Sequence, residues 1–300
     1  MERRDFLKLS ATASIFGSLA WDAVAETVTK KSSTPDLVAV RNGSIKSMFE
    51  AGLKEIGGLP VKGKKVLVKP NIGWNKKPEL AANTNPELVA LIVEAVLKAG
   101  AKEVVVFDHT CQQARACYKN SGIKEAVEKA GGKIIDGNDK RNYIEKTNKK
   151  AVTLKSAKFH KYVYECDYFI NVPVLKNHGG ATLTCAMKNL MGIVLDRRYF
   201  HRNGLHQCIA DSVLYRKPDL NIVDAYRVMF RNGPAGRSVK DVQKMKFQLF
   251  SKDIVAVDVV AAKLLKLDMK KIEHIPKAVA LGLGNDDLKK VKIKKISLKA

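Results

Sequence analysis

The sequence predicts an α/β fold with a mainly parallel, doubly wound-like sheet, helices on both faces and a less regular second half. Two observations lead to this prediction. Segments typical of strands and helices alternate along the first half of the chain, as in folds built from strand–helix–strand units. The stretch EVVVFDH at residues 103–109 is almost continuously apolar, as expected of a parallel strand covered on both faces.

The first half supplies strands and helices in turn. Strands are expected at residues 36–43, 64–74, 103–109 and 133–138, and helices at residues 44–58, 85–101 and 122–131. The helix at 44–58 begins at Ser44 and stops at a glycine pair. Asn85 is suited to cap the next helix, and Pro86 fits its first turn, where a missing N–H costs nothing.

The second half is less regular. Strands are expected at residues 166–180, 219–229 and 244–253, and helices at residues 181–194, 205–216 and 254–267. The tail at 287–298 alternates apolar and basic residues, which predicts a closing edge strand. Asp258, near a helix start, is expected to be a cap. Residues 26–300 are expected to form a single domain, with any division into two lobes near 145–155, beside the polar segment 138–151.

The N-terminus is typical of an export signal. Arg3 and Arg4 precede Phe-Leu-Lys and a moderately apolar run, and residues 23–25 read Ala-Val-Ala, a small-residue cleavage pattern. Paired arginines mark the twin-arginine type. Residues 1–25 are therefore predicted to be a twin-arginine signal that directs the folded protein to the periplasm or another extracytoplasmic space. No later segment has the apolar length of a membrane span, so we expect no integral membrane segment after processing.

The chain is strongly basic, with a formal net charge of +24. The signal segment holds as many acidic as basic residues, so its removal leaves this charge unchanged. Such a charge favours anionic partners, either an acidic redox partner or a small anionic substrate. Nucleic acid is not expected, because the lysines are scattered rather than interleaved with stacking aromatic residues and because the protein is predicted to be exported.

Several familiar site motifs are missing from the sequence. It has no glycine-rich dinucleotide fingerprint and no Walker-type phosphate loop, so no motif supports binding of NAD or ATP. Five cysteines are present without any C-x-x-C spacing, which argues against a self-contained ferredoxin-type site. Cys166 and Cys185 are expected to be packed in the core, although the roles of Cys166, Cys185 and Cys208 cannot be read from the sequence.

Three loops are expected at the carboxyl edge of the sheet, where ligands bind in doubly wound folds. They hold Lys69 and Asn71, the segment 108–117, and Lys176 with His178. Lys176 and His178 are the catalytic candidates. Further candidates to bind a substrate or another anion are Lys188, Arg197, Arg198 and His206. Asp224 faces the same end of the sheet without an identified partner.

Cys111 and Cys117 stand behind Asp108 and His109 in the second of these loops. The residues alone leave three alternatives open: a disulfide, part of a metal site, or two small apolar fillers.

Three blocks of the sequence carry a family resemblance. Residues 66–111, residues 170–194 with the run INVPVLKNHGGATLTCAMKNLMGIV, and KPDLNIVDA at 217–225 resemble the widespread bacterial and archaeal family catalogued as domain of unknown function 362. The resemblance implies that the pair Cys111 and Cys117 belongs to an exported branch, in which it looks like an iron–sulfur ligand pair. Some relatives carry a ferredoxin-like module, which this chain lacks; Cys185 and Cys208 are less typical of the family.

Two cysteines cannot complete a cluster that needs four thiolates. A two-fold homodimer would supply Cys111 and Cys117 from each chain to one bridging 4Fe–4S cluster, with Arg115 and Lys119 offsetting its charge. The expected function is then electron transfer, or reduction of a small anionic substrate by an iron–sulfur-dependent oxidoreductase. The alternative is a non-redox anionic-ligand-binding protein or hydrolase-like enzyme with a Cys111–Cys117 disulfide. A scaffold protein that uses its basic surface is a third reading.

Overall fold

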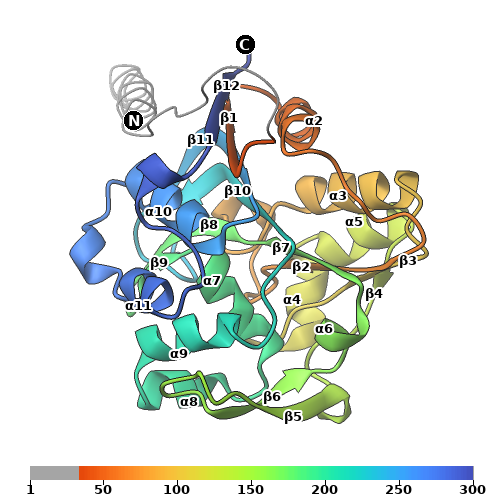
Figure 1. Cartoon of the computed structure of the whole chain (residues 1–300). Helices are drawn as coiled ribbons and strands as arrows, with labels where there is room; N and C mark the ends of the chain where they lie inside the picture. The colour runs from red at the N-terminus through yellow and green to blue at the C-terminus, as the bar shows by residue number, and fades with distance from the viewer. Residues whose placement is uncertain (1–33, 300) are drawn as a thin grey trace.

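A computed structural model describes residues 34–299, and its centre is a ten-stranded sheet (Figure 1). The strand order is β12-β1-β11-β10-β7-β2-β3-β4, with β8 paired to β10 and β9 paired to β8. The strands are β1 (Leu37–Arg41), β2 (Lys65–Pro70), β3 (Glu103–Val106), β4 (Lys133–Ile134), β7 (Tyr168–Val172), β8 (Val174–His178), β9 (Thr182–Thr184), β10 (Leu220–Met229), β11 (Val242–Ser251) and β12 (Ile293–Ser297). The predicted signal segment, residues 1–25, lies outside the described residues.

Most strand pairs of this sheet are parallel, as the sequence predicts. Strands β2, β3, β4 and β7 form a parallel block, and β10 continues it beside β7. Strand β11 is antiparallel to both of its neighbours, β1 and β10, and β9 is antiparallel to β8. The predicted edge strand at the C-terminal end of the chain is β12, which pairs in parallel with β1.

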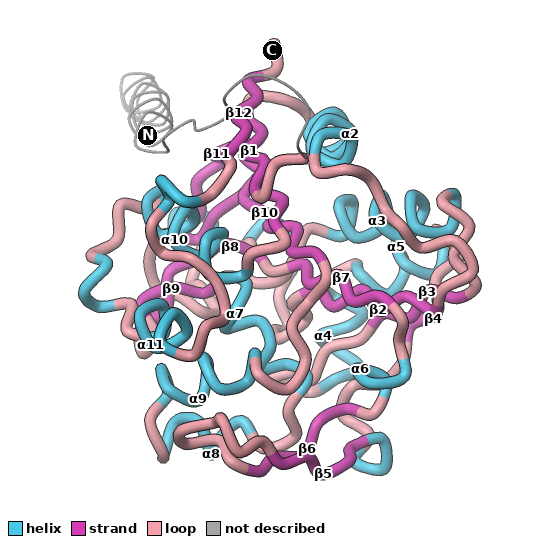
Figure 2. The backbone as a smooth tube through the Cα atoms, in the orientation of Figure 1, coloured by secondary structure: helices cyan, strands magenta, loops and turns pink. Residues whose placement is uncertain are grey.

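Helices lie on both faces of the sheet (Figure 2). Its strands therefore contribute alternate residues to two apolar clusters. In β1, Leu37 and Ala39 join one cluster, and Val38 and Val40 join the other. Helices α2, α3 and α5 pack on the second cluster, and α7, α9, α10 and α11 on the first. The helices are α2 (Ile45–Glu55), α3 (Pro86–Lys98), α4 (Ala114–Asn120), α5 (Ile123–Lys129), α6 (Tyr162–Glu165), α7 (Ala186–Asn189), α8 (Arg197–Arg202), α9 (Leu205–Val213), α10 (Ile254–Leu264) and α11 (His274–Ala280).

The segment around residue 145 forms a separate two-stranded antiparallel sheet, not a long excursion without structure. Its strands are β5 (Tyr143–Thr147) and β6 (Ser156–His160). Phe159 of β6 also bridges to Val194, which joins this hairpin to the chain near the end of the 3-10 helix Leu190–Ile193. Other 3-10 turns lie at Pro78–Leu80, Lys140–Asn142, Val239–Asp241, Met269–Lys271 and Leu288–Lys290.

Polar caps fix where the main helices begin. The Ser44 hydroxyl accepts from the Ser47 N–H at 3.0 Å, and the Asn85 side chain accepts from the Glu87 N–H at 3.0 Å, directly before Pro86. Helix α10 is capped by Asp253. The expectation that Asp258 is the cap of this helix is therefore wrong. Asp258 lies inside α10, and its carboxylate accepts hydrogen bonds from backbone N–H groups of α7.

The expected helix at residues 181–194 is only partly present. Residues Thr182–Thr184 form β9, antiparallel to β8, and the helical part is the short α7 followed by the 3-10 helix. The reason is the turn at the glycine pair, where the ring Nδ1 of His178 accepts from the Gly180 N–H and reverses the chain. The reversal keeps β9 beside β8 at the carboxyl edge of the sheet.

Among residues 34–299, no helix combines the length and the apolar character that crossing a bilayer requires.

Candidate functional site

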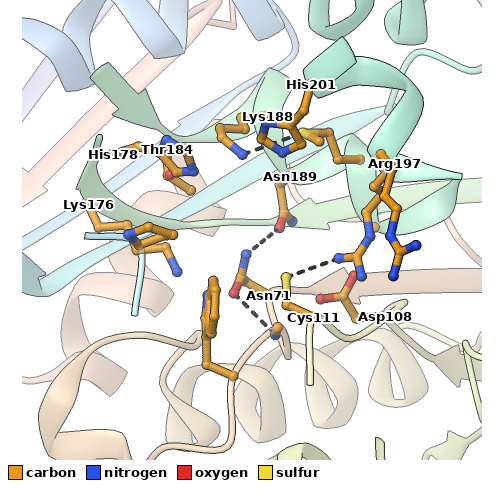
Figure 3. A pocket seen from close by; sticks show the side chains of 16 residues that line it. Asn71, Asp108, Cys111, Lys176, His178, Thr184, Lys188, Asn189, Arg197 and His201 are labelled. Carbon is orange, nitrogen blue, oxygen red and sulfur yellow. Dashed lines mark hydrogen bonds between the residues drawn. The ribbon is translucent and has the colours of Figure 1, made fainter. Parts of the chain in front are cut away.

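A cavity of about 460 Å³ opens at the carboxyl edge of the parallel strands. Figure 3 shows side chains from all three predicted loops turned toward it. The lining residues are Asn71, Gly73, Trp74, Asp108, Cys111, Lys176, His178, Thr184, Lys188, Asn189, Met191, Gly192, Arg197, Arg198, His201 and Pro234. Three predicted candidates, Lys69, Cys117 and His206, are not among them.

Lys69 lies beneath the cavity in a buried ion pair. Its Nζ is 2.8 Å from Oδ1 of Asp108 and also donates to the Pro70 carbonyl. The other oxygen of Asp108, Oδ2, accepts from the Ile72 N–H at 2.7 Å. Burial lowers the pKa of Lys69, against the attraction of Asp108. Lys69 therefore supports the cavity and does not reach a ligand in it.

Gly192 closes over this ion pair. A Cβ at this position would lie 1.8 Å from Oδ1 of Asp108 and 2.7 Å from Nζ of Lys69. Only the missing side chain lets the backbone, which also accepts from the His109 N–H, approach the pair this closely.

Gly192→Ala is therefore expected to destabilise the protein by about 1–3 kcal/mol, since the added methyl group must push the pair apart. Urea unfolding followed by circular dichroism measures the loss. Gly179→Ala is the matched control, because its Cβ would meet nothing closer than 3.9 Å. Equal losses in both variants would contradict the proposed close approach.

Besides the exposed Arg198, three long cationic side chains turn to the cavity without a carboxylate partner among the described residues. Nζ of Lys176 donates to the Ala82 carbonyl, and Nζ of Lys188 lies 3.4 Å from the sulfur of Met191. Arg197 donates through Nη1 to Sγ of Cys111 at 3.1 Å and through Nη2 to the Thr110 carbonyl. The one carboxylate in the lining is that of Asp108, which Lys69 already neutralises.

Burial shifts the ionisation of these groups. It lowers the pKa of Lys176 to about 7 and that of Lys188 to about 8. The nearby Cys111 opposes this lowering, whereas the positive charge of Lys188 lowers the pKa of Lys176 further and that of Arg197 lowers the pKa of Lys188, so Lys188 is repelled by a cation on either side. A negative charge brought into the cavity would relieve this repulsion.

His178 is held as a neutral ring. Its Nδ1 accepts from the N–H groups of Gly180 and Ala181, each at 3.0 Å, so Nε2 carries the ring proton. Burial and the neighbouring lysines hold the pKa of His178 far below its usual range. The ring is therefore suited to donate a hydrogen bond from Nε2 and is not an anion-binding cation.

A chain of amide groups fixes the floor of the cavity. Nδ2 of Asn71 donates to Asn189 at 3.2 Å, Nδ2 of Asn189 donates to Asn171 at 2.9 Å, and Nδ2 of Asn171 donates to Asn221 at 2.9 Å. The chain links the loop after β2 to α7, β7 and β10. Such a connected buried network holds each member in one orientation.

Helix α7, which carries Lys188 and Asn189, is held from the other side by Asp258. The carboxylate of Asp258 accepts from the N–H groups of Ala186 and Met187 at 2.7 and 3.1 Å. Burial raises the pKa of Asp258 to about 7. Asp258 thus acts as a cap after all, but for α7.

The two candidate cluster ligands lie differently. Cys111 is exposed at the cavity, whereas Cys117 is buried in α4 with its sulfur 3.7 Å from the Gly73 carbonyl. Both are free thiols, as are the buried Cys166, Cys185 and Cys208. Within residues 34–299, no group of three or more His, Cys, Asp or Glu side chains is placed to hold a metal ion.

Of the remaining candidates, Arg198 lines the cavity, whereas His206 and Asp224 have partners elsewhere. Arg198 lines the cavity beside Arg197, at the start of α8. His206 instead faces His274, with the two Nδ1 atoms 3.1 Å apart. Asp224 accepts from the N–H of Asn85 at 2.8 Å, so it has a structural partner.

Sequence reasoning did not single out Thr184, Asn189 or Trp74, which also line the cavity. The Thr184 hydroxyl is buried and has no hydrogen-bond partner within the described part of the chain. The only signal for Asn189 was a polar residue within an otherwise apolar segment. No pattern marked Thr184, because its place depends on the β8–β9 turn.

Comparisons with known proteins identify a family without assigning a reaction. A family model described as "Domain of unknown function (DUF362)" matches residues 66–263. A thylakoid-associated protein of Synechocystis sp. is 28% identical over 261 residues, which cover 81% of this chain and 76% of that protein.

Two solved structures are similar at a lower level. The lactate racemase apoprotein of Thermoanaerobacterium thermosaccharolyticum is 13% identical, with a TM-score of 0.41 over 67% of this chain and 53% of that chain. A structural-genomics protein of Thermotoga maritima is 10% identical, with a TM-score of 0.43 over 76% of this chain and 59% of that chain. The present chain thus spans little more than half the length of these two solved chains.

Proposed function

The chain belongs to the DUF362 family, whose description assigns no activity, and from the cavity we propose that it binds a small anionic molecule and acts on it by proton transfer. The observation that carries the proposal is the convergence of Lys176, Lys188 and Arg197 on one cavity without a carboxylate to neutralise them among the described residues. Carboxylate and phosphate groups are the ligands that such donors recognise.

The energetic argument supports an anion. Desolvated like charges repel one another, and the fold carries this cost in the free protein. A bound anion replaces the repulsion by charge-assisted hydrogen bonds in a site that is already largely fixed by the asparagine chain and Asp258. Little reorganisation is then needed on binding.

Lys176 is the group best suited to move a proton. With a pKa of about 7, its amine is present in both protonation states near neutral pH. The side chain is buried, lines the cavity and donates to a single backbone carbonyl, so it is free to exchange a proton with a bound molecule. His178, with its Nε2–H, is placed as a neutral hydrogen-bond donor on the same strand, β8.

Arg197→Met is expected to weaken binding of a carboxylate or phosphate roughly 10- to 100-fold, the usual loss of one charge-assisted contact. Isothermal titration calorimetry with acetate, succinate and inorganic phosphate measures the dissociation constants. Arg202→Met removes the same charge from the same helix, α8, at an exposed position outside the cavity lining, and should leave affinity unchanged. Failure of the unmodified protein to bind any of these anions would refute the proposal.

The iron–sulfur cluster stays a prediction beside this proposal. It is favoured by the exposed position of Cys111 and disfavoured by the burial of Cys117. The homodimer, the electron-transfer role and the exported location depend on the same resemblance and on the N-terminal segment outside the described residues. Measured iron and acid-labile sulfide in the purified protein check the cluster directly.

A further inference from the structure

We infer that the ligand carries two anionic groups at opposite ends of a short chain, as a dicarboxylate or a phosphorylated carboxylate does. The inference rests on the proposed function and specifies its substrate class. It follows from where the cationic groups lie in the cavity, from a hydroxyl without a partner, and from the lack of an available anion in the lining.

One end of the cavity is formed by the β8–β9 hairpin. Lys176 and Thr184 lie there together (Figure 3). Thr184 is only 3% exposed, and its Oγ1 has no hydrogen-bond partner among the described residues. A buried hydroxyl left unpaired costs stability unless a ligand satisfies it. An ammonium and a hydroxyl at one place match the two oxygens of a carboxylate.

The other end is formed by α8 and the loop that follows β3. Arg197 lies across the cavity from Lys176 and Thr184 (Figure 3). Its guanidinium is anchored by the Thr110 carbonyl and by Sγ of Cys111, so its position is set before a ligand binds. A planar guanidinium binds a carboxylate or phosphate in a defined orientation.

Lys188 connects the two ends. In Figure 3 it lies with Asn189 between the hairpin residues and Arg197. Its charge acts on Lys176, and the charge of Arg197 acts on it. A ligand with one anionic group would neutralise one end of this line and leave the other end without a counter-charge. A ligand with an anionic group at each end neutralises both.

The test compares succinate with succinamate, its monoamide, which has the same length and shape but one negative charge fewer. Calorimetric titration of the full chain is expected to show at least about tenfold tighter binding of succinate. The phosphonate analogue 3-phosphonopropanoate is titrated alongside. Tighter binding of the phosphonate than of succinate would support the inference and identify a phosphorylated carboxylate as the source; the reverse order would identify a dicarboxylate.

Two variants test whether Arg197 and Thr184 bind the two ends of succinate. Arg197→Met should abolish the preference for succinate over succinamate. Thr184→Val should reduce succinate affinity without lowering the thermal midpoint of the free protein, because the hydroxyl has no partner to lose. Equal affinity for succinate and succinamate would overturn the inference while leaving the proposed anion site intact. Absence of binding by both, together with acetate and phosphate, would overturn both.

Discussion

Lys69→Met is expected to lower the free energy of unfolding by about 3–5 kcal/mol, the usual cost of removing one partner of a buried ion pair. Among the described residues, the Asp108 carboxylate would keep only the Ile72 N–H as a partner, because nothing there besides Lys69 pairs with Oδ1. Lys69 is itself fully buried, so water cannot replace it.

Urea unfolding at pH 7 measures this loss, with the slope of the transition checked for a two-state process. Lys129→Met is the control: it removes an exposed lysine 2.6 Å from Glu125, and should leave stability unchanged within error. The double variant Lys69→Met/Asp108→Asn removes the stranded charge and should recover about half of the loss. A single variant as stable as the unmodified protein would show that the pair is not formed or not buried.

The affinity for a carboxylate is expected to fall by about 100-fold between pH 7 and pH 9, while the ligand itself keeps its charge. Binding requires the ammonium form of Lys176, and its pKa in the free protein is about 7. Above that pH, each further pH unit lowers the affinity roughly tenfold, because it lowers the protonated fraction of Lys176 by that factor. Lys188, with a pKa of about 8, adds to the loss at the upper end of the range.

Stability should change in the opposite direction over the same range. The pKa of Lys176 is lower in the folded protein than its ordinary value of 10.5, so between these two values the unfolded chain binds more protons. The free energy of unfolding then rises with pH, because burial of the neutral amine costs less than burial of the ammonium. The cost in stability of burying the charged Lys176 is fully present below pH 7 and disappears as the pH approaches 10.5.

Calorimetric titrations and urea unfolding at matched pH values separate the two effects. Lys176→Met should weaken both dependences and leave only the part that Lys188 contributes at the upper end of the range, whereas Arg202→Met should preserve both in full. Affinity that is constant from pH 7 to pH 9 would contradict the assignment of Lys176 as a binding group.

The sequence predicted the parallel sheet and the edge at which the site lies, because both depend on local signals. Apolar runs such as residues 103–109 mark buried strands, and the polar residue that follows each run marks its carboxyl end. Asn71, Cys111 and Lys176 were selected in this way, and all of them line the cavity.

Other features depend on contacts between distant segments. Lys69 ends a buried strand and looks like a ligand group, but its role is decided by Asp108, a residue on the neighbouring strand's loop. Whether Cys117 is exposed depends on how α4 packs, and the place of Thr184 depends on a hairpin whose sequence also reads as a helix. His206 does not line the cavity, because its ring faces His274, which lies on a different helix.

The position of β11 in the sheet has a consequence for the order in which the chain folds. Among the described residues, β1 is hydrogen-bonded only to β11 and β12, which follow it by about two hundred residues and more. During synthesis, the apolar β1 must therefore wait for these partners until the intervening segments have been made. Contacts of such long range slow folding. A chain without β11 and β12 would leave an aggregation-prone edge uncovered.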